Sequence, residues 1–239
     1  MPSKHYYVFG DEGAFDDLNK EAWDALRIGN ANPDFRFETS AEEYASACLK
    51  RTDCRAVAEV VLDCLHIIGG ESMQVVSLGA GKGIVEWHLK HMAPDIRMIC
   101  TDYAEAGVDR LRRLFVECDQ VTTFDMLKDD YGRFSKDSVL LMNRVSTEFD
   151  QFEWRRIFRS CRGAGIRHIL YIPTEFATFR LKVAEAARHA LRRILRRCDT
   201  FCGWLYGRRE LELMMTAEYE ICAFRRLGNG GVYMLKSRK

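Results

Sequence analysis

Short apolar runs alternate with helical segments between residues 73 and 174, and this alternation limits the chain to few folds. Strands that alternate with helices form right-handed crossovers, which place the strands side by side in a parallel sheet. The apolar runs are continuous, as in strands that are covered on both faces. We therefore expect strands over 73–79, 96–102, 120–125, 138–145 and 166–174, and helices over 84–92, 106–118 and 153–165.

The end of the chain has a different pattern. Residues 219–228 and 230–239 are strand-like and flank Asn229-Gly230, a pair that favours tight two-residue turns. We expect an antiparallel C-terminal hairpin that completes the sheet, after a helix near 208–216. Five parallel strands followed by a hairpin predict an α/β fold with a mostly parallel sheet.

Two segments lie outside this sheet. Residues 1–70 predict a helical N-terminal extension or lid, with helices near 16–27 and 53–68 and a helix-capping pattern that begins at Thr39 and Ser40. Residues 174–207 predict a helical cover inserted after the fifth strand. The main domain is therefore expected over 71–239.

The charge balance gives no global attraction to nucleic acid or membrane, because 36 basic residues are matched by 35 acidic ones. Nine cysteines, an odd number, lie mostly in apolar stretches and indicate a reducing compartment. Cys198 and Cys202 are not spaced like a zinc-binding pair, so no metal site is expected. With no signal-like N-terminus and no long apolar run, we expect a cytoplasmic protein without a membrane span.

The stretch VVSLGAGKG, residues 75–83, follows the first strand of the sheet. Its glycines, Gly79, Gly81 and Gly83, permit the backbone to pass close to a nucleotide at the carboxyl edge of the sheet. Two acids support a ligand site over a plain glycine-rich turn. Asp102 ends the second strand, where a carboxylate can accept both ribose hydroxyls, and Asp125 ends the third, where it either meets an adenine amino group or caps a helix.

The glycine spacing separates two kinds of adenosine ligand. Dinucleotide-binding loops have a third glycine that packs the helix under a pyrophosphate, whereas Ile84 and Val85 stand at that place here. No second, substrate-binding domain follows the sheet either. The loop therefore favours S-adenosylmethionine over a dinucleotide.

In these features residues 73–237 resemble the class I S-adenosylmethionine-dependent methyltransferases. The resemblance implies a Rossmann-like, mostly parallel seven-stranded sheet and S-adenosyl-L-methionine as cofactor. It also implies that the cofactor contacts lie in the glycine loop, after the second and third strands, and in the fourth-strand segment 140–149. These positions are Ser77, Gly79, Ala80, Gly81, Gly83, Asp102, Tyr103, Asp125, Met126, Asn143 and Arg144.

One position departs from the family pattern. Ser77 stands where most members have the acid that helps to hold the methionine ammonium group. A hydroxyl accepts a hydrogen bond but supplies no charge, so either the affinity is lower or another acid substitutes, with Glu148 as a candidate. The methionine carboxylate requires a cation or backbone amides, and Arg36, Arg51 and Arg144 are the candidate cations.

Methyl transfer requires alignment of donor and acceptor, and a base only where the acceptor carries a proton. A base should lie near the ends of the fourth and fifth strands, where Glu148, Tyr171 and Glu175 qualify. Each has a structural alternative, such as a helix cap for Glu148 and a core position for Tyr171. The leading hypothesis is transfer to an oxygen or nitrogen of a small molecule: a metabolite, a glycan or a lipid headgroup.

Two other hypotheses remain open at this stage. The segment 180–197 places arginines mostly on one helical face, at Arg188, Arg192, Arg193, Arg196 and Arg197. This indicates either a solvated face or a surface for an anionic partner: RNA, acidic lipid headgroups or a phosphorylated substrate. The RNA hypothesis keeps the cofactor and changes the acceptor. The third hypothesis is a non-catalytic partner subunit that binds the cofactor, and Ser77 is the residue that favours it.

Overall fold

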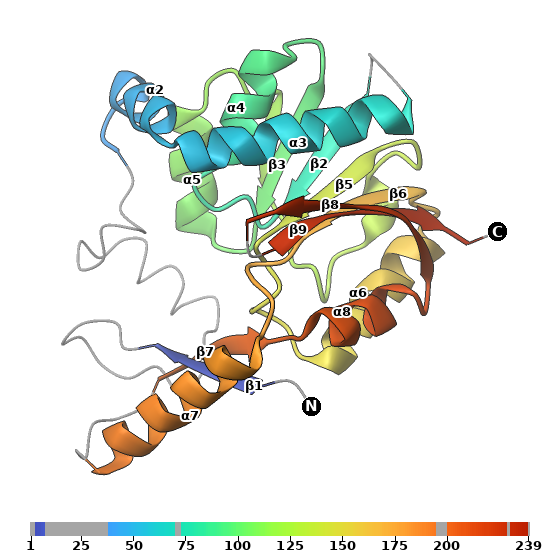
Figure 1. Ribbon diagram of the computed structural model, residues 1–239. Coiled ribbons are helices and arrows are strands. Elements are labelled where there is room, and N and C mark those ends of the chain that lie inside the picture. Colours follow the sequence, from blue (N-terminus) through green and yellow to red (C-terminus); the bar gives the residue numbers. More distant parts are fainter. Residues whose placement is uncertain (1–2, 8–37, 70–72, 195–199, 229, 239) are drawn as a thin grey trace.

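The computed structural model (Figure 1) describes residues 3–7, 38–69, 73–194, 200–228 and 230–238. Its centre is a seven-stranded mixed sheet with the strand order β4-β3-β2-β5-β6-β9-β8. The strands are β2 (Gln74–Leu78), β3 (Arg97–Asp102), β4 (Gln120–Thr123), β5 (Val139–Asn143), β6 (His168–Ile172), β8 (Tyr219–Leu227) and β9 (Gly230–Ser237).

The pairing within this sheet follows the sequence pattern. The five strands from β2 to β6 pair in parallel, and β9 pairs antiparallel with both β6 and β8. This confirms the expected α/β fold with a mostly parallel sheet and an antiparallel C-terminal pair. Position 229, in the expected turn of this pair, lies outside the described residues.

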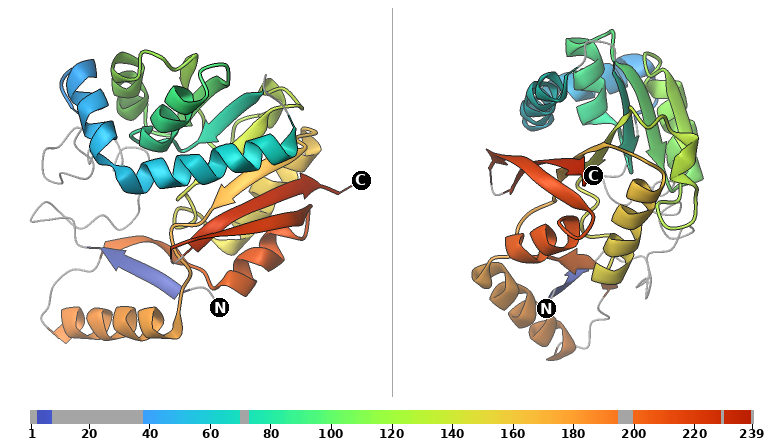
Figure 2. Two further views of the ribbon diagram at one scale, coloured as in Figure 1. Left: turned by 45° about the horizontal axis from the view of Figure 1, so that its top comes forward. Right: turned by 90° about the vertical axis from the view of Figure 1, so that its right-hand side faces the viewer.

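Helices cover both faces of the sheet (Figures 1 and 2). One face carries α2 (Ala41–Lys50), α3 (Thr52–Ile68), α4 (Ile84–Met92) and α5 (Glu105–Leu114), and the other carries α6 (Gln151–Gly163) and α8 (Arg208–Met215). A short 3₁₀ turn spans Tyr131–Arg133. Within the described residues, no helix combines the length and apolar character needed to cross a membrane.

Alternate residues of the central strands enter two different cores. Val75 and Leu141 pack with α3 and α4, whereas Val76 and Leu140 pack with α6 and α8. All four side chains are fully buried. Both faces of the strand are therefore apolar, which explains why the apolar runs are continuous in the sequence.

A strand in the insert departs from the expectation of helical segments over 1–70 and 174–207. The insert does contain a helix, α7 (Phe179–Ile194), but it also contains a strand, β7 (Thr200–Leu205). This strand pairs antiparallel with β1 (Ser3–Tyr7) in a separate two-stranded sheet. Figure 1 shows β1, β7 and α7 together, beyond the edge where the parallel strands end. The helix expected near 16–27 lies outside the described residues.

The two-stranded sheet is attached to the main domain through the loop after β5. The Trp204 amide donates a hydrogen bond to the Thr147 carbonyl at 2.8 Å. Gly203 lies so close to Thr147 that an added Cβ would overlap its backbone. A side chain at this position would therefore separate the insert from the domain.

Helix α6 supports the loop after β5 through its first residues and their cap. Asp150 caps the helix, since its carboxylate accepts from the backbone amides of Phe152 and Glu153. Trp154 is fully buried against Phe149, Phe158 and Tyr171. Its indole N–H donates to the Ser146 carbonyl at 3.3 Å. The tryptophan thus links the core to the loop that follows β5.

We expect Trp154→Ala to lower the free energy of unfolding by about 3–5 kcal/mol, because a large buried ring is replaced by a cavity. Phe152→Ala, two residues away on the same helix, removes a ring that is 67% exposed and should cost under about 0.5 kcal/mol. Urea unfolding followed by circular dichroism measures both. Equal losses would show that Trp154 does not carry this part of the core.

Candidate functional site

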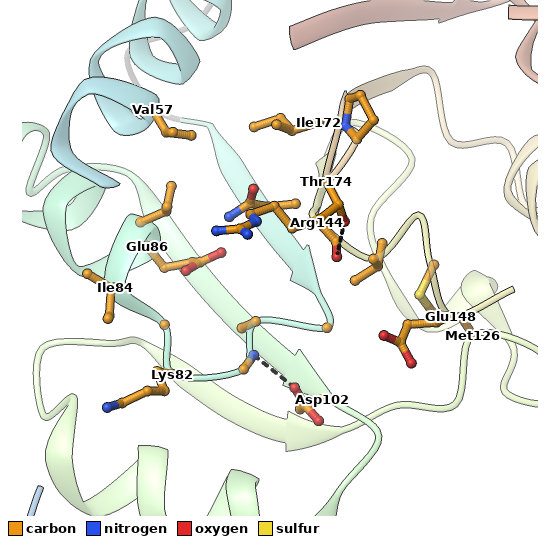
Figure 3. Close-up of a pocket in the computed structure, with 18 of the residues that line it drawn as sticks. Val57, Lys82, Ile84, Glu86, Asp102, Met126, Arg144, Glu148, Ile172 and Thr174 are labelled. Atoms are coloured by element: carbon orange, nitrogen blue, oxygen red, sulfur yellow. Dashed lines mark hydrogen bonds between the residues drawn. The ribbon is translucent and has the colours of Figure 1, made fainter. Parts of the chain in front are cut away.

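A cavity of about 1070 Å³ opens at the carboxyl edge of the parallel strands (Figure 3). Its wall is formed by the loop after β2, the ends of β3, β5 and β6, the first half of α3, and the ends of β8 and β9 that face each other. Ligand cavities in proteins usually measure about 300–1,000 Å³, so this one lies at the upper end of the ordinary range.

The loop after β2 lies along one wall of the cavity. Gly79, Gly81 and Gly83 have φ angles of 71°, 59° and 66°, in the left-handed region that glycine adopts without a steric penalty. The loop is held by the Ala80 amide, which donates to the Thr101 carbonyl at 2.8 Å. An added Cβ would lie 2.5 Å from Val145 Cγ1 at Gly79, but would meet nothing within 4 Å at Gly81. The backbone at Gly81 is therefore open to a ligand.

Asp102 ends β3 beside this loop. Its carboxylate is 4% exposed and accepts hydrogen bonds from the Gly81 amide at 2.8 Å and the Ala104 amide at 3.0 Å. Both bonds fix the carboxylate at the cavity wall, where a ligand hydroxyl can reach it. A hydrogen bond thus joins the glycine loop to Asp102, the last residue of β3.

The residues after β4 form the next part of the wall. Asp125 lines the cavity, and its Oδ1 accepts from the Leu127 amide at 2.9 Å. Asp125 therefore caps a local turn and also faces the cavity. Both expectations for this acid, a cap and a contact to an adenine amino group, fit the geometry. Met126 and Tyr103 also line the cavity. The structure brings these predicted cofactor contacts together.

Ser77 does not line the cavity. It is fully buried, and its hydroxyl donates to Oε1 of Glu86 on α4 at 2.6 Å. Glu86 itself lines the cavity and is 1% exposed. Burial raises the pKa of this carboxyl, and the hydrogen bond from Ser77 partly opposes that effect. The serine thus positions a carboxylate that comes from the helix.

Asn143, the last residue of β5, and Arg144, which follows it, complete this region. Arg144 has a φ of 59°, the one left-handed backbone among the described residues other than glycine. The strained conformation is held on both sides: the Arg144 amide donates to the Ile172 carbonyl at 2.8 Å, and Thr174 Oγ1 donates to the Arg144 carbonyl at 3.0 Å. Such strain costs about 1–3 kcal/mol and is concentrated at functional sites. Asn143 lines the cavity beside it.

No family model and no curated protein matches the sequence. Solved structures do match. The mitomycin 7-O-methyltransferase MmcR has a TM-score of 0.60 at 14% identity, over 92% of this chain and 72% of that one. Magnesium protoporphyrin IX methyltransferase ChlM from Synechocystis PCC 6803, solved with bound S-adenosylhomocysteine, has a TM-score of 0.59 at 12% identity, over 79% and 85% of the two chains.

The chain has the class I methyltransferase fold. It spans about half the length of another match, the pyocyanin biosynthetic protein PhzM, where the TM-score is 0.52 at 14% identity over 70% of this chain and 51% of that one. At these identities the likeness establishes the fold, and the chemistry has to be argued from the residues.

The three candidate bases lie in different places within the methyltransferase fold. Glu148 lines the cavity and is exposed. Tyr171 and Glu175 do not line it. Tyr171 is fully buried in the aromatic cluster around Trp154, and burial raises the pKa of its hydroxyl far above the ordinary value. We therefore correct the expectation for Tyr171. The register of β6 turns it toward α6, and its neighbour Ile172 faces the cavity instead.

Other cavity residues were absent from the sequence prediction. Glu86 is the main one. Its sequence signal is weak, an acid between Val85 and Trp87 in a short helix, and the structure buries every residue from Val85 to Leu89. Val57 and Cys54 on α3 and Leu227 on β8 also line the cavity. Their elements are far from the loop in the sequence, so no local pattern indicates that they meet it.

Gly79 and Gly81, two of the three loop glycines, allow a matched comparison of stability. Gly81→Ala should lower the free energy of unfolding by about 1–2 kcal/mol, the cost of a left-handed alanine. Gly79→Ala should lower it by about 2–5 kcal/mol, because the new Cβ also overlaps Val145. Chemical denaturation measures both. A larger loss at Gly81 than at Gly79 would contradict this packing.

Glu86→Gln should stabilise the ligand-free protein at neutral pH, because it removes a buried charge. The folded-state pKa of Glu86 lies above that of the unfolded chain, so protonation favours the folded state at low pH and this contribution is lost as pH rises through the folded-state pKa. The advantage of Gln over Glu in thermal unfolding should therefore grow from pH 4 to pH 7. An advantage that shrinks over this interval would contradict the assignment.

Proposed function

We propose that the protein transfers a methyl group from S-adenosyl-L-methionine to an oxygen of a small-molecule acceptor. The observation that carries this proposal is the junction of the left-handed glycine loop with Asp102 at the wall of the cavity. The shared fold supports it, since MmcR and ChlM are methyltransferases by name. ChlM holds S-adenosylhomocysteine, the product that remains after transfer.

The residues at this wall fit the donor. Gly81 has open space where a side chain would stand, so the backbone leaves room for a sugar and a sulfur. Asp102 is oriented by two backbone amides and would accept the ribose hydroxyls, and Tyr103, Asp125 and Met126 would surround the adenine. When bound, S-adenosylmethionine supplies an electrophilic methyl group. The chain contributes position and the exclusion of water.

The remaining wall defines the acceptor side. Val57, Ile172, Pro173 and Leu227 give it an apolar surface, and the half-buried Trp204 adds an aromatic ring. An acceptor with an apolar body fits these residues better than a sugar would. Transfer to oxygen is favoured because MmcR is named a 7-O-methyltransferase, and transfer to nitrogen remains the alternative.

A hydroxyl acceptor has to lose its proton. Glu148 is the candidate base that lines the cavity, and Figure 3 shows its carboxylate directed into that space. Glu148 lies in the loop after β5, where its amide donates a hydrogen bond to the Val145 carbonyl at 3.2 Å. Glu148 would take the proton from the acceptor hydroxyl, while Glu175 stands outside the wall.

Two alternatives from the sequence have less support. The RNA hypothesis depends on arginines of the segment 188–197. Arg196 and Arg197 lie outside the described residues, as do the side chains of Arg188, Arg192 and Arg193. The hypothesis of a non-catalytic subunit depends on the missing acid at Ser77, and Glu86 brings a carboxylate to the same place.

Titration calorimetry with S-adenosylhomocysteine tests the donor site. We expect saturable one-to-one binding that falls at least tenfold in Asp102→Asn, because a hydrogen bond to a charged group contributes about 1.5 kcal/mol or more. Asp109→Asn is the control, since this acid lies on the exposed side of α5 and pairs with Arg112. No binding by the unaltered protein would contradict the proposed donor. Labelled methyl transfer to a panel of apolar hydroxyl compounds then tests the acceptor.

A further inference from the structure

Glu86 is a buried carboxyl group that faces the cavity. A carboxylate in this setting costs several kcal/mol unless a charged or polar partner compensates it. Ser77 donates a hydrogen bond to it, and within the described residues no lysine or arginine lies within ion-pair distance of it. None of the described residues therefore places a positive group in contact with Glu86, and a ligand can supply one.

Arg144 has the complementary property. Its side chain is exposed at the cavity wall and forms no ion pair with any acid in the described part of the chain. Figure 3 shows the side chains of Arg144 and Glu86 pointing toward each other across the cavity. The strained backbone of Arg144 is fixed by Ile172 and Thr174, and it sets the direction in which the side chain leaves the main chain. Glu86 and Arg144 thus bring a carboxyl group and a guanidinium to the same part of the cavity wall without forming an ion pair.

Asn143 adds a third contact on the same wall. Its Oδ1 is buried and has no hydrogen-bond partner among the described residues. In the sheet Ser77 pairs with Leu141, and Asn143 follows two positions later, so Asn143 and Ser77 lie on the same face. This is the face from which Glu86 reaches Ser77. A ligand group with more than one N–H can donate to this oxygen and to the Glu86 carboxyl at once.

We propose that Glu86, Asn143 and Arg144 form a subsite that recognises an α-amino acid zwitterion, the methionine end of the donor. The inference rests on the proposed function. The ammonium group donates to Glu86 and Asn143, and the carboxylate accepts from Arg144. A simple cation is disfavoured by the guanidinium, and a simple anion by the buried carboxylate, so both charges of a zwitterion are needed. Glu86, positioned by Ser77, then replaces the acid that the strand lacks.

Two ligands separate this subsite from the rest of the cavity. S-adenosylhomocysteine carries the amino acid end, and 5′-methylthioadenosine has the same adenosine and sulfur without it. Calorimetry should show that the unaltered protein binds the first at least a hundredfold more tightly. Glu86→Gln and Arg144→Gln should each weaken S-adenosylhomocysteine at least tenfold and change the affinity for 5′-methylthioadenosine less than twofold. The control Glu59→Gln, an exposed acid on α3, should change neither.

A rescue variant tests the relocation of the acid. Ser77→Asp combined with Glu86→Gln returns the carboxylate to the strand and should recover part of the lost affinity for S-adenosylhomocysteine. The subsite is overturned if the unaltered protein binds both ligands equally, or if either single variant weakens both ligands by the same factor. If Glu86→Gln does not fold, two measurements still decide whether the subsite exists. They are the effect of Arg144→Gln and the ratio of the affinities of the unaltered protein for the two ligands. If the unaltered protein binds neither ligand, the proposed function itself fails.

Discussion

The left-handed backbone between β2 and α4 is the constraint on which the site depends. Three glycines permit the chain to turn from a buried strand into a helix within five residues and to remain close to β3 and β5. The turn places the Gly81 amide against Asp102 and leaves open space above Gly81. It also fixes where α4 begins, and therefore where Glu86 enters the cavity. The donor wall and the charged subsite both follow from this one turn.

The placement of charge in the cavity shows how stability is exchanged for binding. Glu86 is buried with a raised pKa, and Arg144 holds a strained backbone. Both features cost free energy in the ligand-free protein. Both are supported by neighbouring hydrogen bonds, from Ser77 to the carboxylate and from Thr174 to the strained peptide. Costs of this kind are usual where a protein is preorganised for a ligand.

Most of the fold was predictable because its signals are local. The boundaries of α4 agree with the sequence pattern, and the strand ends differ by at most two residues. The pairing of β1 with β7 was not predictable, since the two strands are nearly two hundred residues apart and each is too short to show a periodicity. The site divides in the same way: Asp102 follows from its place at a strand end, whereas Glu86 reaches Ser77 from another element and Tyr171 turns away through the strand register.

The measurement that tests the account most directly is a crystal structure of the protein with S-adenosylhomocysteine. The account predicts the ribose hydroxyls on Asp102, the thioether over Gly81, the ammonium group within hydrogen-bond distance of Glu86, and the carboxylate on Arg144. A ligand bound elsewhere, or bound in this cavity with its amino acid end away from Glu86 and Arg144, would contradict the account.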